Sequence, residues 1–183
     1  MTTERMRVLP PDEYSHLRPM AQLCADAFSE GQYVDQYCAH YIGNSHYDWS
    51  VSRLVLDGGT VLHHWGVWGY PMRVETVTLK VAGIGAVVTH PEARKQGLMH
   101  QAAQASFDAM REAGYDLSIL RGRHYVKMGY ARAWNYVTYR LKPEELPAGG
   151  EPPAYQPLEL GQVAEMDALY NQTHADFTGT AIR

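Results

Sequence analysis

The chain contains little cysteine, no long apolar run and no excess of one charge. Cys24 and Cys38 are its two cysteines among 183 residues. Both fall in helical patterns, so we expect reduced, buried thiols rather than a disulfide framework. The net charge of −4 does not favour binding along nucleic-acid phosphates. No apolar run is long enough to span a bilayer, and none follows residues 1–5 as in a signal peptide. We therefore expect a cytoplasmic protein with neither a membrane nor a nucleic-acid partner.

The spacings typical of metal sites and serine hydrolases are also missing. The nine histidines include no His-x-x-x-His pair, and no Cys-x-x-Cys occurs. The neighbours His63 and His64 point to opposite faces of a predicted strand, so they do not form a metal pair. No metal site is predicted. No Gly-x-Ser-x-Gly elbow occurs, although a Ser-His-Asp triad stays open because its members can come in any order.

What the chain does contain is the pattern of one globular α/β domain with a sizeable core. Hydrophobic residues make up 45% of the chain and charged residues 20%. Alternating and β-branched runs predict strands at residues 6–9, 50–56, 60–70, 75–88, 116–120 and 134–141. Helical spacing predicts helices at residues 19–28, at 34–42 and from Gly97 to Gly114. The first helix is placed from Pro19 because proline cannot sit deep inside a helix.

Residues 85–101 carry the most informative pattern. The β-branched run Val87-Val88-Thr89 ends at His90-Pro91, a polar loop follows, and Gly97 opens a helix. The first N–H groups of a helix have no intrahelical acceptor, and the helix dipole favours an anion there. Since Arg94 and Lys95 add positive charge, we interpret this loop as a pyrophosphate site. The alternative is an ordinary helix-entry turn with solvated basic residues.

These residues resemble a known family. The spacing Arg94-x-x-Gly97 after a strand is similar to the acetyl-CoA loop of the GNAT acetyltransferases, although Met99 stands where Gly or Ala is usual. The wider string from Gly83 to Pro91, with Gly97-Leu98-Met99, resembles the enhanced-intracellular-survival (Eis-like) branch. Downstream, Tyr125-Val-Lys-Met-Gly-Tyr130 resembles the Tyr-x-x-Phe-Gly-Tyr segment of that branch, with Met128 in place of Phe.

The resemblance implies a GNAT fold, an α/β fold in which helices flank a mixed, mostly antiparallel central sheet. It implies an N-acetyltransferase that moves acetyl from acetyl-CoA directly to an amine in a ternary complex. Tyr125 would be the general acid for the leaving thiolate, a role that suits a phenol with a pKa near 10. The alternative for Tyr125 is a core aromatic with a satisfied hydroxyl. The cofactor-binding residues that the resemblance implies are Val87, Val88, Thr89, Arg94, Lys95, Gln96, Gly97, Leu98, Met99, His100, Leu120 and Arg121.

The general base and the acceptor stay open. In the resembled branch the base is the C-terminal carboxylate of a longer chain, and His63, His64 or a water chain could serve instead. Tyr33, Tyr37, Tyr41 and Tyr47 could line the acceptor pocket or simply pack between helices. The amine could be an aminoglycoside, a polyamine, a peptide N-terminus or a lysine. A non-catalytic acyl-CoA-binding or interaction module is the alternative function.

The end of the chain changes character. Half of the ten prolines fall in residues 142–157, which predicts a linker at 143–157 after an N-terminal GNAT domain at 1–142. A predicted strand at 156–160 and helix at 161–173 repeat the opening order of the chain. By resemblance, residues 158–183 begin a second, truncated GNAT-like domain, so we expect a fragment of a longer protein. The apolar face of that helix would pack on the first domain, pair with another copy of the chain, or stay mobile.

Overall fold

A computed structural model describes residues 6–43, 46–133, 138–146, 149–150, 157 and 159–183. The chain forms two compact units. The first runs to Arg121 and includes Asp176–Ile182, and the second comprises Gly122–Ala175 with Arg183. Each unit is described by itself below. The predicted division into domains at 1–142 and 158–183 stays a prediction.

The first unit is built on one mixed sheet. Its strands in the described residues are β1 (Arg7–Leu9), β2 (Arg53–Asp57), β3 (Thr60–Val74), β4 (Val77–Thr89), β5 (Leu117–Ile119) and β6 (Thr180–Ala181). The first five lie in chain order across the sheet, and β6 pairs with β3. Every pair is antiparallel except β4 with β5. The predicted fold class, a mixed and mostly antiparallel sheet flanked by helices, is therefore confirmed.

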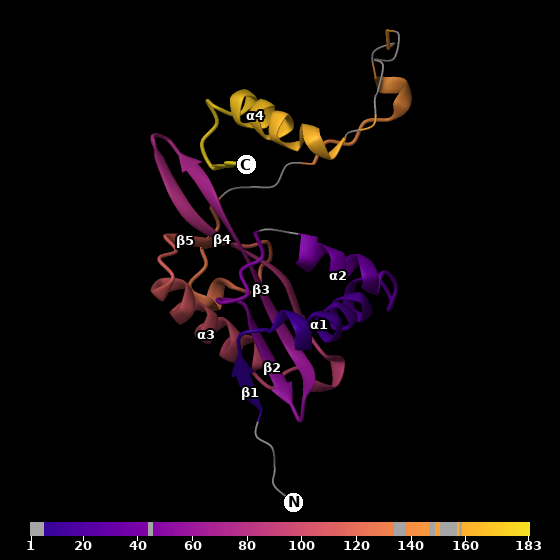
Figure 1. Cartoon of the computed structure of the whole chain (residues 1–183), viewed down its shortest axis with the longest axis vertical. Helices are drawn as coiled ribbons and strands as arrows, with labels where there is room; N and C mark the ends of the chain where they lie inside the picture. The colour runs from indigo at the N-terminus through magenta and orange to yellow at the C-terminus, as the bar shows by residue number, and fades with distance from the viewer. Residues whose placement is uncertain (1–5, 44–45, 134–137, 147–148, 151–156, 158) are drawn as a thin grey trace, which may run out of the picture. The chain divides into compact units, whose positions relative to one another are not determined.

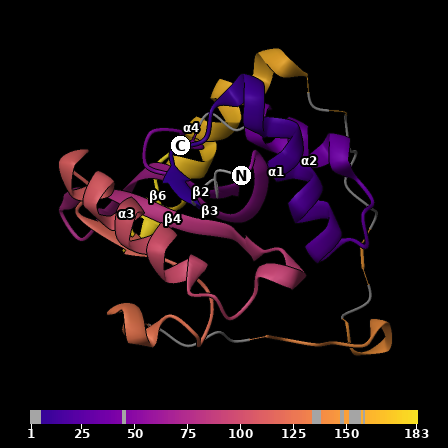
Figure 2. The ribbon, with the colours of Figure 1, turned by 90° about the horizontal axis from the view of Figure 1, so that it is seen from below.

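Helices cover both faces of this sheet. Helices α1 (Glu13–Phe28) and α2 (Val34–Gly43) lie together on one side, and α3 (Leu98–Glu112) lies on the other (Figures 1 and 2). Because β4 and β5 are parallel, the chain must cross from one end of the sheet to the other between them, and α3 makes that crossing.

The start of α1 differs from the prediction, which began the helix at Pro19. The helix begins at Glu13, where the Asp12 carboxylate accepts a hydrogen bond from the Ser15 amide at 2.8 Å. This N-cap satisfies a first-turn donor. Pro19 then lies inside the helix on an exposed position. The carbonyl of Ser15, which loses its intrahelical donor there, belongs to an exposed residue that water can reach.

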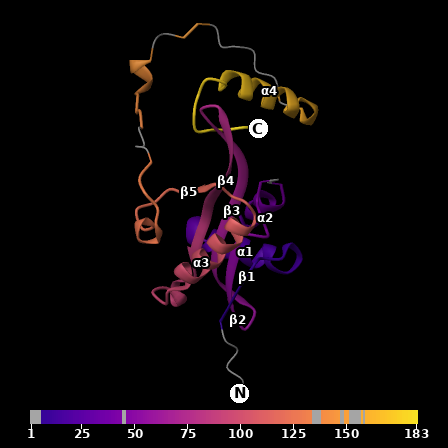
Figure 3. The ribbon, with the colours of Figure 1, turned by 90° about the vertical axis from the view of Figure 1, so that its left-hand side faces the viewer.

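The hairpin of β3 and β4 is longer than the predicted strands at 60–70 and 75–88. It extends beyond β2 and β5 (Figure 3) and turns at Glu75, which has a positive φ of 54°. Pro71 lies inside β3. It is tolerated because its carbonyl accepts from the Ile182 amide at 2.9 Å, while no donor is required of it.

Each face of the sheet has its own apolar layer. Under α1, Met20 and Cys24 pack with Leu54 and Val88 in one buried cluster. On the α3 side, the fully buried Trp65 meets Phe107 edge-to-face, with ring centroids 5.9 Å apart. The buried residues of α3 include Leu98, Ala102, Ala103 and Met110. Small side chains in this set let the helix approach the sheet closely.

The second unit contains short helices. They are the 3₁₀ helices η2 (Val126–Met128), η3 (Pro143–Glu145) and η4 (Leu160–Gln162), followed by α4 (Val163–Thr173). Helix α4 confirms the helix predicted at 161–173. Of the strand predicted at 134–141, residues 134–137 lie outside the described residues, and 138–141 are not strand. Of the strand predicted at 156–160, residues 156 and 158 lie outside them, and Leu160 begins η4.

Gly66 tests how tightly β3 and β4 approach each other. A Cβ at this buried position would meet the Gly85 carbonyl oxygen at 2.9 Å and the rings of His64 and Trp68 at 2.8 Å. We expect Gly66→Ala to lower the free energy of unfolding by about 1–3 kcal/mol, as other overpacked cores do. The check is urea unfolding, read as a lower midpoint at unchanged m-value.

Gly161→Ala is the matched control, because a Cβ at Gly161 meets nothing within 4 Å. Equal midpoints for the two variants would contradict the close packing at Gly66.

Candidate cofactor site at the end of β4

The second half of β4 has no strand beside it on the side of β5. The two strands pair only where Val81–Gly83 faces Leu117–Ile119, although β4 continues to Thr89. In the described part of the chain, no other strand takes the place of β5 next to residues 84–89. Unpaired backbone N–H and C=O groups are therefore available to a ligand along this edge. Val87, Val88 and Thr89 lie on it.

A bulge interrupts β4 at the same place. In the register with β3, His64 faces Val88 and Gly66 faces Gly85. Two residues of β4, Ala86 and Val87, therefore oppose the single residue Trp65. Ala86 has a φ of 46°, in the left-handed region that alanine rarely adopts. Such a bulge bends a strand and changes the direction of its backbone groups.

The loop after β4 leads into α3 and presents amides and positive charge. The 3₁₀ helix η1 (Pro91–Ala93) is followed by exposed residues from Arg94 to Gly97. Gly97 is the N-cap of α3 with a φ of 77°, and it supplies no side-chain cap. The His100 amide donates to the Gly97 carbonyl at 3.0 Å. The amides of Leu98 and Met99 meet no acceptor among the described residues, and the first turn of α3 has no acidic side chain.

This arrangement fits a pyrophosphate. Consecutive amides at a helix N-terminus, with Arg94 and Lys95 beside them, form an anion-binding concavity. A Cβ at Gly97 would meet nothing within 4 Å, so the loop is open at this point. Lys95 also has a positive φ, 64°, which turns the chain sharply just before Gly97. The sequence-based interpretation of a strand, an open turn and a helix N-terminus is confirmed as local structure.

The remaining predicted residues lie in two places. Leu120 and Arg121 come directly after β5, in the first unit with the loop. Tyr125 belongs to the second unit, where it caps η2 and is half-buried. Its ring lies against Gly122, and its centroid is 6.3 Å from that of Tyr130. Burial raises the pKa of the Tyr125 phenol, which keeps the proton on its oxygen at neutral pH.

His63 and His64 do not behave as candidate bases. Both are fully buried in β3. Burial lowers the pKa of His63 to about 3, and the electrostatic interaction with the His64 ring lowers it in the same direction. Burial also lowers the pKa of His64 to about 4, although its bond to the Ala86 carbonyl opposes the shift. A side chain with so low a pKa is a poor proton acceptor near pH 7.

The four tyrosines considered for an acceptor pocket have different environments. Tyr33 is 59% exposed, and Tyr37 packs partly buried against the core cluster. Tyr41 belongs to α2, but its side chain lies outside the described part of the structure. Tyr47 is buried at 5% exposure and borders a pocket.

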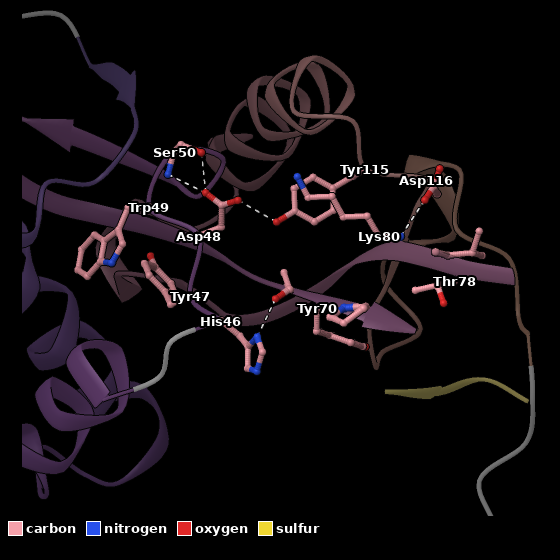
Figure 4. A pocket seen from close by; sticks show the side chains of 13 residues that line it. His46, Tyr47, Asp48, Trp49, Ser50, Tyr70, Thr78, Lys80, Tyr115 and Asp116 are labelled. Atoms are coloured by element: carbon pink, nitrogen blue, oxygen red, sulfur yellow. Dashed lines mark hydrogen bonds between the residues drawn. The ribbon is translucent and has the colours of Figure 1, made fainter. Parts of the chain in front are cut away.

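That pocket, which the sequence did not predict, lies at the other end of β4 from the loop. It has a volume of about 740 Å³ and is bordered by residues 46–50, by β3 around Tyr70 and by β4 from Thr78 to Lys80 (Figure 4). Tyr115 crosses it and donates its hydroxyl proton to Asp48 Oδ2 at 2.8 Å.

Asp48 is one of three charged residues that line this pocket, with Lys80 and Asp116. Its Oδ1 accepts from the Ser50 amide at 3.0 Å and from the Ser50 hydroxyl at 2.6 Å. Partial burial alone would raise the pKa of Asp48, but these hydrogen bonds and that of Tyr115 outweigh it and lower the pKa. Asp48-x-Ser50 is a local turn signal that sequence reading could have used. The contact with Tyr115 has no such signal.

Two further features concern metals and membranes. Within the described ranges, no group of three or more His, Cys, Asp or Glu side chains could hold a metal ion. None of the helices described is long and apolar enough to cross a membrane.

Comparison with known proteins assigns the family. A profile of the acetyltransferase (GNAT) domain matches residues 13–133, more than half of the chain. The chain therefore belongs to the GNAT acetyltransferase family. A search of curated proteins found no match.

Solved structures share the fold at low identity. An aminoglycoside N-acetyltransferase, AAC(6')-Iy in complex with CoA, superposes with a TM-score of 0.61 at 14% identity, over 75% of this chain and 95% of that one. Glucosamine-6-phosphate N-acetyltransferase from Arabidopsis thaliana gives 0.59 at 12% identity, over 76% and 100%. A GCN5-related N-acetyltransferase from Kribbella flavida gives 0.57 at 20% identity, over 69% of this chain but only 32% of that longer protein.

The buried histidines predict sensitivity to acid. Unfolded histidine has a pKa near 6.5, whereas His63 and His64 stay neutral in the folded protein down to about 3 and 4. Below pH 6.5 the unfolded chain therefore binds more protons than the folded one. We expect the free energy of unfolding to fall between pH 6.5 and 4, by up to about 1.4 kcal/mol per pH unit for each histidine. Urea unfolding at several pH values measures this slope.

His63→Gln should flatten the slope, whereas His100→Gln, at an exposed position, should leave it as in the unchanged protein. The same slope in both variants would show that His63 is not a buried neutral group.

Proposed function

We propose that this chain is an acetyl-CoA-dependent N-acetyltransferase that moves acetyl directly to an amine in a ternary complex. The observation that carries the proposal is the combination of an unpaired β4 edge with an uncapped, positively flanked amide loop at its end. A long thiol cofactor whose amide-rich arm is joined to a pyrophosphate matches both features: the loop would bind the pyrophosphate, and the strand edge would bind the arm. The CoA complex among the structural neighbours supports this choice.

The resemblance implies a role for each of the predicted cofactor-binding residues, and the geometry is compatible with those roles. Backbone groups of Val87 and Thr89, with Val88 between them, would bind the pantetheine arm and the thioester carbonyl. The amides from Lys95 to His100, with the Arg94 side chain, would bind the pyrophosphate. Leu120 and Arg121 would border the gap from the end of β5.

Tyr125 would supply the proton that the chemistry needs. The amine nitrogen attacks the thioester carbon, a C–N bond forms, and the C–S bond breaks to release CoA thiolate. The Tyr125 hydroxyl would protonate that thiolate, while the amine loses a proton to a base. A phenol whose pKa is raised by burial is protonated and ready to act as this acid. With His63 and His64 buried and neutral, a carboxylate from a longer chain or a water chain is the better source of the base.

The finer assignment is to the Eis-like branch, with residues 158–183 as the start of a second GNAT-like domain and a cytoplasmic location. The motifs from Gly83 to Met99 and from Tyr125 to Tyr130 support it. The long Kribbella flavida protein, of which this chain spans about a third, is consistent with it. Because an aminoglycoside N-acetyltransferase is among the structural neighbours, aminoglycosides and other small amines are the first acceptors to test.

Gly97 offers a direct test of the pyrophosphate loop. Acetyl-CoA should raise the melting temperature of the protein, since a ligand that binds only the folded state stabilises it. We expect Gly97→Asp to abolish this shift, because a carboxylate would stand where the phosphates bind. The side chain has room, as nothing lies within 4 Å of a Cβ there, and Asp tolerates a left-handed φ.

Gly97→Asn is the matched control, equal in size and backbone preference but neutral. It should keep most of the thermal shift. Loss of the shift in both variants would point to backbone disturbance instead of charge, and no shift in the unchanged protein would reject acetyl-CoA as its ligand.

Tyr125→Phe tests the general acid by removing one hydroxyl. We expect kcat to fall by roughly 10²-fold or more while the affinity for CoA changes little, because the phenol acts only on the leaving thiolate. Steady-state kinetics with a panel of amines and a CoA titration measure the two effects.

Tyr130→Phe is the control, since its ring neighbours that of Tyr125 in the same unit. Equal losses in the two variants would assign Tyr125 to packing. A protein that binds acetyl-CoA but acetylates no amine, with or without Tyr125, would favour the non-catalytic acyl-CoA-binding module.

A further inference from the structure

We propose that His64, held by Tyr47, is a positioning residue that fixes the bulge of β4 and so orients the backbone groups against which the thioester binds. The inference rests on the proposed function and adds to it a buried polar pair. Neither side chain would touch the substrate. Both would act through the backbone of Ala86.

The hydrogen bonds define one arrangement of protons. His64 Nδ1 lies 2.8 Å from the Ala86 carbonyl oxygen, and His64 Nε2 lies 2.9 Å from the Tyr47 hydroxyl. A carbonyl oxygen can only accept, so Nδ1 carries the proton and donates it. Nε2 then accepts from the Tyr47 hydroxyl. Both side chains are buried, His64 completely, so water does not compete for these bonds.

The bulge needs such an anchor. Ala86 holds a φ of 46°, a conformation that is unfavourable for a residue with a Cβ and persists only where its surroundings enforce it. His64 Nδ1 donates a hydrogen bond to the carbonyl oxygen of Ala86. Tyr47 is itself fixed, because it forms a β-bridge with Trp68 on the next part of β3. Ala86 is therefore connected to β3 by its hydrogen bond to His64, and His64 is in turn held by Tyr47.

The bulge also decides what β4 presents to a ligand. Along a strand, successive residues direct their backbone groups to opposite edges. One extra residue reverses this alternation for every residue that follows. The extra residue at Ala86–Val87 therefore sets which amides and carbonyls from Val87 to Thr89 face the unpaired edge. A second contact supports the same segment at its end: His63 Nδ1 lies 2.7 Å from Thr89 Oγ1.

Two amide substitutions separate the two bonds of His64. An Asn side chain places its N–H₂ near the position of Nδ1 and can still donate to Ala86. A Gln side chain reaches the position of Nε2 and keeps only the contact with Tyr47. Because both put a neutral amide into the same buried site, His64→Asn and His64→Gln share the cost of a smaller polar group in the core.

We expect His64→Gln to lower kcat by about tenfold or more and to weaken acetyl-CoA binding, whereas His64→Asn stays within about threefold of the unchanged protein. Misplaced reacting groups produce losses of this kind. CoA keeps the pantetheine arm but lacks the thioester carbonyl, so its affinity should fall less than that of acetyl-CoA in His64→Gln. Tyr47→Phe, which removes one hydroxyl, should lower kcat by a smaller factor, and Tyr14→Phe, at a 96% exposed position, should change nothing.

Amide hydrogen exchange without ligand tests the geometry separately from activity. Exchange of residues 86–89 should be faster in His64→Gln than in His64→Asn. Equal exchange, or equal kinetic losses in the two variants, would overturn the positioning role. If the unchanged protein neither binds nor turns over acetyl-CoA, the proposed function fails and the catalytic part of this inference falls with it. In that case the exchange result still decides whether His64 holds the bulge.

Discussion

The unpaired edge of β4 is the constraint on which the rest of this structure depends. Beyond the pairing with β5, which ends at Ile119, β4 continues to Thr89 paired with β3 alone among the described strands. Leaving polar backbone groups without partners costs free energy, on the order of 1–3 kcal/mol for each buried one. A fold that keeps this edge open must satisfy it with a ligand or with water. The loop before α3 directly follows the end of β4 in the chain, so the open edge leads into the loop proposed to bind the pyrophosphate.

The side chains that contact the bulge beside this edge are neutral. His64 and Tyr47 join the bulge to the neighbouring strand without bringing in a charge, which would be costly in a buried site. Burial keeps His64 neutral by lowering its pKa to about 4. The same burial raises the pKa of Tyr47 and keeps its hydroxyl proton. A network of fixed donors and acceptors can therefore hold Ala86 in one conformation over the ordinary range of pH.

Sequence patterns predicted the parts of this structure that depend on neighbouring residues. The alternation in β4, the glycine at the start of α3 and the spacing of Arg94 and Gly97 are all local, and they located the loop correctly. The predicted start of α1 at Pro19 was wrong, because proline at this exposed position leaves a hydrogen bond unmade at little cost. The Asp48–Tyr115 hydrogen bond joins residues far apart in the chain, and no local pattern indicates it. His63 and His64 were expected on opposite faces of a strand, but only the three-dimensional structure reveals their partners.

The residues proposed to bind the cofactor and the residue proposed as the acid belong to different units of the chain. Every residue proposed to bind the cofactor, from Val87 to Arg121, belongs to the first unit, and the proposed acid Tyr125 belongs to the second. The bulge, the loop and the supporting histidine all lie in the first unit. If the proposed roles hold, substitutions in the second unit should change turnover without changing affinity. The pair of Tyr125 and Tyr130, both within it, is therefore the place where catalysis can be separated from binding.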